Sequence, residues 1–291
     1  MIAKEIFISC RPQHWIKNLF VFAAIVFSKN IFNLSLLEKT VVAFISFCLL
    51  SSSLYILNDL KDLEEDKRHP LKSKRPLASG RLEKSYAIYS FAALGFSGLI
   101  LSASLNWAFF LISLVFFILQ VAYSFWLKHV VILDVFVIAA GFLIRIVAGG
   151  LAIKVTLSSW LLICSTLLAL FLALSKRRHE LVFLEKKASE HRPILEEYSP
   201  YFLDQLIAVV TASIVVAYCL YTISEETVAK FGTANLLFTV PFVLYGIFRY
   251  LYLIHQKVEG GSPETLIIKD KPLLIDIFLW IVSAVLILYK K

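Results

Sequence analysis

Three aspartates that follow a long apolar run have the spacing that most clearly indicates chemistry. Asp59, Asp62 and Asp66 are spaced i, i+3 and i+7, so a helix would place their carboxylates on one face. Carboxylates gathered on one face repel each other, and Mg²⁺ relieves that repulsion by binding oxygen ligands and bridging them to substrate phosphates. Asn58 can add a carbonyl ligand. These four residues are therefore predicted to bind Mg²⁺, with the three aspartates acting in catalysis.

The basic segment 67–80 follows the aspartates directly and favours a phosphorylated substrate. Its prolines and its glycine predict a shaped loop rather than a helix. Arginine can bind a phosphate through two hydrogen bonds and lysine supplies a point charge, so Lys74 and Arg75 are candidate substrate ligands. Two alternatives remain open. The aspartates can form a solvated helix end neutralised by neighbouring lysines, and each lysine of the loop can contact lipid headgroups.

A second group of candidate residues lies in segment 123–129 and in the apolar run that follows it. Asp134 falls about one turn into that run, and Arg145 lies eleven residues further on the same helical face. Charged groups within a membrane span usually face a bundle interior or an aqueous cavity. We therefore expect Asp134 to act in catalysis and Tyr123, Lys128 and Arg145 to bind substrate. A structural ion pair between Asp134 and Arg145, or a polar contact to another helix, is the alternative.

The composition indicates that lipid is the solvent of most of the chain. Of the 291 residues, 59% are hydrophobic and 17% are charged, and the mean hydropathy is +0.79. Soluble domains are about 45–50% apolar. Long apolar runs in lipid form helices, because the backbone must satisfy its own hydrogen bonds there. We expect an all-α, polytopic membrane protein with one domain, residues 1–291. The nine predicted spans are 15–33, 38–58, 85–104, 106–126, 130–152, 157–175, 203–223, 234–254 and 273–289.

The distribution of basic residues predicts the orientation of these spans. With the N-terminus inside, 21 of the 29 Lys and Arg residues fall in cytoplasmic segments, 6 in outer segments and 2 within apolar runs. Cytoplasmic loops are enriched in Lys and Arg, so loops 59–84, 176–202 and 255–272 are predicted to face the cytoplasm from an inner or plasma membrane. The net charge of +8 is therefore interpreted as a topology signal, and nucleic acid is not an expected partner.

Several other classes of site are absent from the sequence. The four cysteines are far apart without CxxC spacing, so neither a disulfide framework nor a zinc site is expected. The sequence contains no GxSxG, HExxH, Walker A or GxGxxG motif. Charged residues interrupt the N-terminal segment before the first long apolar run, and we do not expect a cleavable signal peptide there.

The acidic motif and the following KRPLASG segment (residues 74–80) together resemble the first signature of the UbiA superfamily of intramembrane prenyltransferases. Further segments resemble its decaprenyl-phosphate phosphoribosyltransferase branch. The resemblance covers nearly the whole chain and implies helices around a central cavity with a cytoplasmic polar cap. Many members carry a second aspartate-rich motif, but this chain has only Asp134 in that region. The phosphoribosyl branch resembles this chain in having a single acidic residue there. The segments concerned are RPQHWIKN, YSFWLKHVVILD, IRIVAGG, SKRRHEL and GGSPETLIIKD.

The resemblance implies a Mg²⁺-dependent transfer of 5-phosphoribose from 5-phosphoribosyl 1-diphosphate to a polyprenyl phosphate, with release of diphosphate. The donor carries a second phosphate group, for which Lys17, Lys176 and Arg177 are the candidate cations, with Glu180 nearby in the same polar segment. The polyprenyl tail would lie in an apolar groove open to the bilayer.

Two rival functions share parts of this pattern. One is a prenyltransferase that joins a prenyl diphosphate to an aromatic or other small acceptor, and the other is a transporter or lipid-binding scaffold. The prenyltransferase would use a prenyl diphosphate as donor instead of 5-phosphoribosyl 1-diphosphate. A scaffold or transporter is argued against if Asp59→Asn or Asp62→Asn abolishes activity and leaves the protein folded. A homo-oligomer is one option for the quaternary structure.

Overall fold

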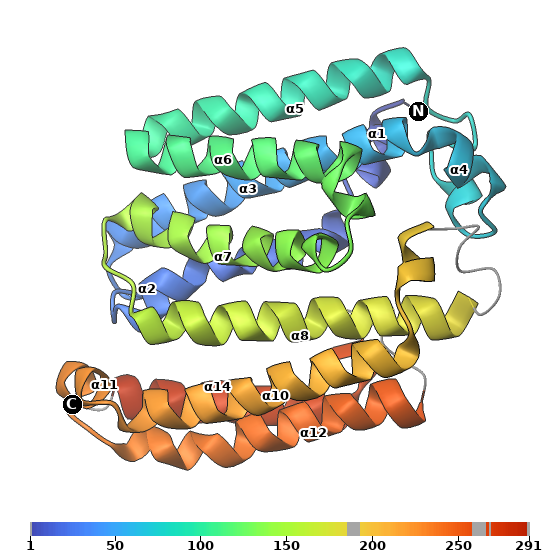
Figure 1. The fold of residues 1–291 in the computed structure, drawn as a ribbon. Helices are drawn as coiled ribbons and strands as arrows, with labels where there is room; N and C mark the ends of the chain where they lie inside the picture. Colours follow the sequence, from blue (N-terminus) through green and yellow to red (C-terminus); the bar gives the residue numbers. More distant parts are fainter. Residues whose placement is uncertain (1, 185–192, 258–265, 268, 290–291) are drawn as a thin grey trace. The chain divides into compact units, whose positions relative to one another are not determined.

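A computed structural model describes residues 2–184, 193–257, 266–267 and 269–289, and the regular elements in these ranges are all helices (Figure 1). The chain forms two compact units, Met1–Leu157 and Ser158–Lys291, which are described separately. The all-α prediction is confirmed. The prediction that both units belong to one domain stays a prediction.

Four helices of membrane-spanning length, α3, α5, α6 and α7, dominate the first unit. Short helices and 3₁₀ turns precede them and join them at their ends. In chain order the elements are α1 (Ile2–Ser9), η1 (Pro12–Phe22), α2 (Ala23–Phe27), α3 (Leu34–Lys61), α4 (Leu63–Arg68), η2 (Lys72–Lys74), α5 (Lys84–Leu105), α6 (Trp107–Phe125), η3 (Leu127–His129) and α7 (Leu133–Ile153).

The second unit contains four more candidate spans, of which one combines a 3₁₀ turn with the helix after it. The elements are α8 (Ser159–Leu184), η5 (Pro193–Glu197), α10 (Pro200–Ile223), α11 (Glu225–Phe231), η6 (Asn235–Thr239), α12 (Val240–Gln256) and α14 (Lys271–Tyr289). Hydrogen bonds join three of these elements, α10, η6 and α14. The Tyr218 hydroxyl lies 2.7 Å from Thr239 Oγ1 and accepts from Trp280 Nε1 at 2.9 Å.

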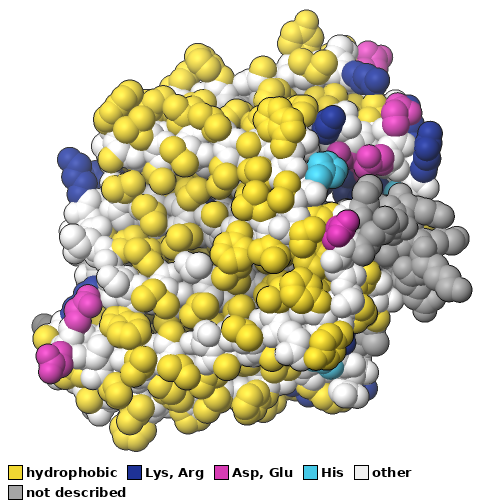
Figure 2. Space-filling model, viewed as in Figure 1, with side chains coloured by type: hydrophobic (Ala, Val, Ile, Leu, Met, Phe, Trp, Pro, Cys, Tyr) yellow, Lys and Arg dark blue, Asp and Glu magenta, His cyan; other side chains and the backbone are white. Residues whose placement is uncertain are grey.

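The described residues contain eight helices long and apolar enough to cross a membrane. Hydrophobic side chains cover most of the surface visible in Figure 2, as expected for helices in contact with lipid. The sixth predicted span differs from the structure, because α8 continues nine residues past its predicted end at 175 and reaches Leu184. Residues 176–184 were therefore wrongly predicted to be loop. A helix can continue into water without a break, since its backbone bonds are internal.

The first predicted span, 15–33, is not a regular α-helix. Residues Pro12–Phe22 form a 3₁₀ helix and Ala23–Phe27 a short α-helix. At their rises of ~2.0 and ~1.5 Å per residue, the two elements extend roughly 30 Å, about the thickness of the hydrocarbon core. They run antiparallel to α3, since Arg11 pairs with Asp59 near its last turn while Asn18 bonds Cys48 nearer its middle. This segment is the candidate for a ninth crossing, which stays a prediction.

Small residues allow α3 and α5 to pack closely in the first unit. A Cβ at Gly98 would lie 2.8 Å from the Leu50 side chain, so a larger residue there would displace Leu50. The Ser46 hydroxyl donates to the Gly98 carbonyl at 2.9 Å and lies 2.6 Å from the Ser102 hydroxyl. Close contact between small residues and buried hydroxyl hydrogen bonds are the usual means of joining helices in lipid, where no hydrophobic effect drives them together.

Helix α7 contacts the 3₁₀ segment η1 even more closely. A Cβ on Gly149 would lie 2.0 Å from the Val21 carbonyl oxygen and 2.9 Å from its carbonyl carbon. Both are backbone atoms, so no side-chain rotation relieves the overlap. Glycine at position 149 is therefore a condition for η1 to lie against α7.

We expect Gly149→Ala to lower the thermal unfolding midpoint of the detergent-solubilised protein by several degrees, because overpacking costs about 1–3 kcal/mol or more. Gly150→Ala is the matched control on the same helix. Its added Cβ would lie 3.0 Å from the Leu157 side chain, which is flexible and can shift, unlike backbone. Equal midpoints for the two variants would contradict the close contact between α7 and η1.

Candidate active site

The three aspartates lie where α3 ends and α4 begins. Asp59 belongs to the last turn of α3, Asp62 is the residue between the two helices, and Asp66 lies in α4. The helical hydrogen bonding continues across the junction, since the Asp62 amide donates to the Asn58 carbonyl at 2.9 Å and the Asp66 amide to the Asp62 carbonyl at 2.8 Å. Asp59 and Asp66 are almost completely buried, at 3% and 1% exposure. Carboxylates this buried require cationic or hydrogen-bonding partners.

Arg75 supplies positive charge to both buried carboxylates. Its Nη1 atom lies 3.1 Å from Asp59 Oδ1 and 2.5 Å from Asp66 Oδ2. One guanidinium nitrogen thus lies between two carboxylates, and Lys72 Nζ approaches Asp66 from 3.9 Å. The extended backbone of Arg75 after the short turn η2 directs the side chain back toward α3 and α4. The structure therefore places Arg75, a predicted substrate ligand, within the acidic cluster.

Arg11 supplies a second guanidinium to the Asp59 carboxylate, and it was not among the predicted site residues. Its Nη2 atom donates to Asp59 Oδ1, and the guanidinium lies 5.1 Å from the Tyr55 ring centroid. The backbone of Arg11 is left-handed, with φ 52°. Such a conformation is costly for a residue with a Cβ and is often found at functional sites. Burial lowers the pKa of Arg11, and the Asp59 charge opposes that shift.

Lys128 neutralises the third aspartate. Its Nζ atom lies 2.6 Å from Asp62 Oδ1, although 66 residues separate the two in the chain. Both side chains are partly buried, with exposures of 13% and 17%. The short turn η3 between α6 and α7 carries Lys128 to this position. The structure thus joins the first and second groups of candidate residues at one end of the first unit.

The acidic cluster provides a suitable donor set for a divalent cation, although not in the predicted form. Within the described ranges, no three His, Cys, Asp or Glu side chains converge on a common point. Asp59 and Asp66 instead form a pair around Arg75, while Asp62 pairs with Lys128. The cluster contains only hard oxygen donors, and its paired carboxylates already surround a positive charge, both of which suit Mg²⁺. The half-buried Asn58 uses its backbone carbonyl to accept from Asp62.

Asp134 and Arg145 are both buried on α7, as expected for charged groups within a span. The Arg145 guanidinium donates to Asn18 Oδ1 at 2.7 Å, to the Gly141 carbonyl at 2.7 Å and to Ser51 Oγ at 3.2 Å. The contacts to Asn18 on η1 and Ser51 on α3 explain how the charge of Arg145 is accommodated. They correspond to the alternative named above, a polar contact to another helix, and not to the predicted substrate contact.

The turn before Asp134 is strained. Ile132 has φ 67° and ψ −44°, an unusual conformation for a β-branched residue. The Leu133 amide donates across this turn to the Val131 carbonyl at 2.7 Å. Strain of this kind persists only where the surrounding structure holds it, and it is often found beside functional groups.

The remaining predicted substrate ligands differ in their burial. Lys17 and Tyr123 are half-buried, and the Lys74 side chain is exposed. In the second unit, Lys176, Arg177 and Glu180 lie on α8, where the almost fully buried Arg177 pairs with Glu180. The polar segment 259–264 lies outside the described residues.

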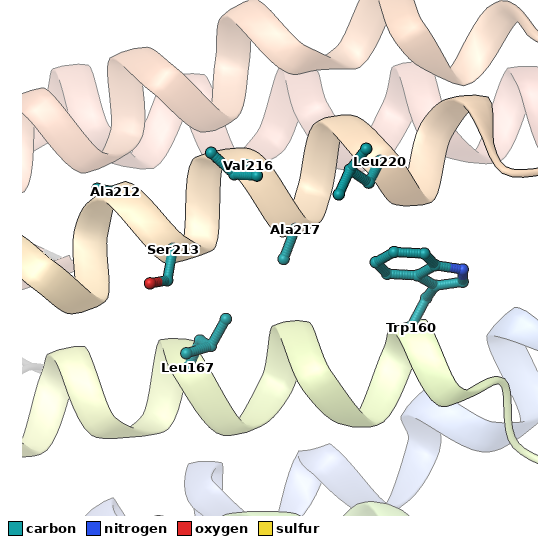
Figure 3. Close-up of a pocket in the computed structure, with 7 residues that line it drawn as sticks. All are labelled: Trp160, Leu167, Ala212, Ser213, Val216, Ala217 and Leu220. Carbon is teal, nitrogen blue, oxygen red and sulfur yellow. The ribbon is translucent and has the colours of Figure 1, made fainter.

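An apolar groove of about 420 Å³ lies between α8 and α10 in the second unit (Figure 3). None of the seven residues drawn in the groove has a titratable side chain. Its lining is Trp160, Leu167, Ala212, Ser213, Val216, Ala217 and Leu220.

Comparison with known families identifies the chain. The model of the UbiA prenyltransferase family matches residues 18–282. This chain belongs to the UbiA prenyltransferase family. The match begins at Asn18, so Arg11 lies outside the matched residues although its side chain contacts Asp59.

Curated relatives within this family match almost end to end. Decaprenyl-phosphate phosphoribosyltransferase from Mycolicibacterium smegmatis is 34% identical over 282 residues, covering 93% of this chain and 88% of that protein. The protein of the same name from Corynebacterium glutamicum is 31% identical, covering 96% and 85% of the two chains.

Solved structures support the UbiA fold. A UbiA homolog from Archaeoglobus fulgidus bound to GPP and Mg²⁺ superposes with a TM-score of 0.75, covering 98% of this chain and 99% of that chain. The sequences are 20% identical, so this similarity concerns the fold alone.

Arg75 occupies the position between Asp59 and Asp66 in this UbiA family member, so it should compete with a divalent cation for these carboxylates. We expect Arg75→Met to tighten Mn²⁺ binding about tenfold in the absence of diphosphate, since a charged hydrogen bond is worth roughly 1.5 kcal/mol or more. Electron paramagnetic resonance of free Mn²⁺ measures the change. Lys67→Met, which removes an exposed ion pair with Glu64, is the control. Unchanged or weaker Mn²⁺ binding by Arg75→Met would contradict the competition.

Proposed function

We propose that this chain transfers 5-phosphoribose from 5-phosphoribosyl 1-diphosphate to a polyprenyl phosphate and releases diphosphate. The proposal rests on the arrangement of alternating charges at the end of α3, in which Arg11, Asp59, Arg75 and Asp66 form a continuous chain of ion pairs. The names of the two curated relatives, which match over most of the chain, support the choice of substrates.

The arrangement of cations suits a donor with a diphosphate and a separate phosphate. Arg11, Arg75 and Lys128 each pair with a carboxylate, and Lys72 lies at the edge of the same cluster. Asp59, Asp62 and Asp66 would hold the metal ion, and Arg11, Arg75 and Lys128 would bind phosphate oxygens. Arginine is suited to bidentate phosphate contacts and lysine to point-charge contacts.

The proposed reaction breaks the bond between C1 of the ribose and the diphosphate oxygen and forms a bond from C1 to an oxygen of the lipid phosphate. Mg²⁺, when bound, would neutralise charge on the departing diphosphate. Arg11 and Arg75 would stabilise the same developing charge through hydrogen bonds. The lipid phosphate is already anionic at neutral pH, so no strong general base is required to activate it.

The site is proposed to face the cytoplasm of an inner or plasma membrane. The excess of Lys and Arg in the segments that share the side of Asp59 supports this orientation. A soluble, highly charged donor would then reach the site from water, while the polyprenyl tail would stay in the bilayer.

Transfer of label from radiolabelled 5-phosphoribosyl 1-diphosphate into butanol-extractable lipid tests the proposal. We expect labelling by membranes that contain this protein, Mg²⁺ and added polyprenyl phosphate, and at least a hundredfold loss in Asp62→Asn, about the effect of removing a key electrostatic contact in a transition state. Glu64→Gln is the matched control, because this carboxylate is 70% exposed and pairs only at the surface with Lys67.

Three outcomes would count against the proposal. Activity on a prenyl diphosphate with an aromatic acceptor, without lipid labelling, would indicate the broader prenyltransferase reaction. A correctly folded protein that binds lipid but transfers neither group would indicate a scaffold. Equal activity of Asp62→Asn and the Glu64→Gln control would remove Asp62 from the mechanism.

A further inference from the structure

Arg145 is a buried cation inside the membrane-spanning part of the first unit. It is 7% exposed, and its three hydrogen-bond acceptors are an amide oxygen, a carbonyl and a hydroxyl. Its guanidinium carbon lies 4.6 Å from the Phe116 ring centroid and 5.9 Å from those of Phe47 and Phe142. Keeping a charge in such surroundings is costly, so a buried charge of this kind calls for a functional explanation.

The contacts of Arg145 join three elements at one point. Arg145 lies on α7, Asn18 on η1 and Ser51 on α3. Asn18 is fully buried and completes the junction, since its Oδ1 also accepts from Ser51 Oγ at 3.3 Å and its Nδ2 donates to Cys48 Sγ at 3.3 Å. A planar guanidinium with several fixed donors can bridge such partners, whereas a single ammonium cannot match the same geometry.

A continuous series of contacts connects this junction to the candidate active site. Trp15 Nε1 donates to Ser52 Oγ at 3.0 Å, and Ser52 Oγ donates to the Cys10 carbonyl at 3.3 Å. One turn further along α3, Tyr55 packs against the Arg11 guanidinium, and Arg11 then reaches Asp59. The contacted positions on α3 run from Cys48 to Asp59, while their partners run back along the N-terminal segment from Asn18 to Arg11 and Cys10.

The distances along the two elements agree. Asn18 lies seven positions after Arg11, the residue that precedes η1, and seven steps at the 3₁₀ rise correspond to about 14 Å. Eight residues of α-helix separate Ser51 from Asp59, a rise of about 12 Å. A junction that sets Asn18 beside Ser51 therefore sets Arg11 beside Asp59. A slip of η1 by one residue would move the guanidinium by about 2 Å, which is enough to break its ion pair.

We infer that Arg145 is a positioning residue, which fixes η1 against α3 and thereby places the Arg11 guanidinium at the diphosphate site. The inference rests on the proposed function for the identity of the anion, but the geometry it describes is independent of which group the diphosphate carries. Arg145 acts through Asn18 and Ser51 and does not contact the substrate.

The first test is a double-mutant cycle on binding of inorganic diphosphate in the presence of Mg²⁺, measured by titration calorimetry on the full-length protein. We expect Arg145→Met and Arg11→Met each to weaken binding about tenfold, and the double variant to be no weaker than Arg11→Met, because coupled residues are not additive. Ser102→Ala is the control, since it removes a buried hydrogen bond between α3 and α5 away from this series of contacts.

The second test uses Cys10, the neighbour of Arg11, as a native reporter of the position of η1. Cys10 is 7% exposed, and burial raises the pKa of its thiol, so a water-soluble maleimide should react slowly with the wild-type protein. We expect Arg145→Met to accelerate the reaction about tenfold or more, in proportion to the local opening. Replacing Cys164 and Cys219 with Ala lowers the background, and Cys10→Ala identifies the labelled site.

The outcomes separate positioning from a general structural role. Additive losses in the double variant, or unchanged diphosphate affinity and Cys10 reactivity in Arg145→Met, would overturn the inference. If Arg145→Met fails to fold, Arg145→Lys and Ser51→Ala replace it. Each is expected to weaken diphosphate binding and to accelerate Cys10 labelling, by less than Arg145→Met would. If even the wild-type protein does not bind diphosphate, the proposed function fails, and Cys10 labelling still tests the positioning.

Discussion

Compensation of buried charge is the constraint on which the first unit depends. Asp59 and Asp66 are almost inaccessible to water, and a buried carboxylate is tolerable only with a close cationic partner. Arg75 between them and Arg11 on Asp59 meet that requirement, and they dictate where the loop after α4 and the start of η1 must lie. Two carboxylates and two guanidinium groups are thus brought together at the end of α3.

The same constraint operates deeper in the membrane-spanning part, where polar groups hold helices together. Hydroxyls of α3 bond the carbonyls of Gly98 and Phe91 on α5, while the amide of Asn18 and the guanidinium of Arg145 form a second junction with η1 and α7. Lipid tails offer no competing hydrogen bonds, so each of these contacts also selects a particular register. The α3 helix is the common partner, and its serines supply the bonds to α5, α7 and η1.

Hydropathy predicted most of the helices closely because the requirement to satisfy backbone groups in lipid is local. The runs at 85–104, 203–223 and 273–289 correspond to α5, α10 and α14 with small shifts at their ends. The prediction was least accurate where polar residues enter an apolar run. Segment 15–33 became a 3₁₀ helix followed by a short α-helix, because its polar side chains bond α3. The end of α8 was placed too early because charged residues do not stop a helix, whose backbone hydrogen bonds are internal.

The sequence by itself determined the all-helical membrane architecture, the acidic motif and the resemblance to the UbiA family, because each depends on composition or on residues close together in the chain. Only the tertiary structure decided which cations meet the aspartates. Arg11 is 48 residues from Asp59, and Lys128 is 66 residues from Asp62. It also decided that Arg145 bonds Asn18, 127 residues away. Such pairings depend on how helices pack, and packing follows from small residues and buried polar contacts on facing surfaces, which the periodicity of a single helix does not specify.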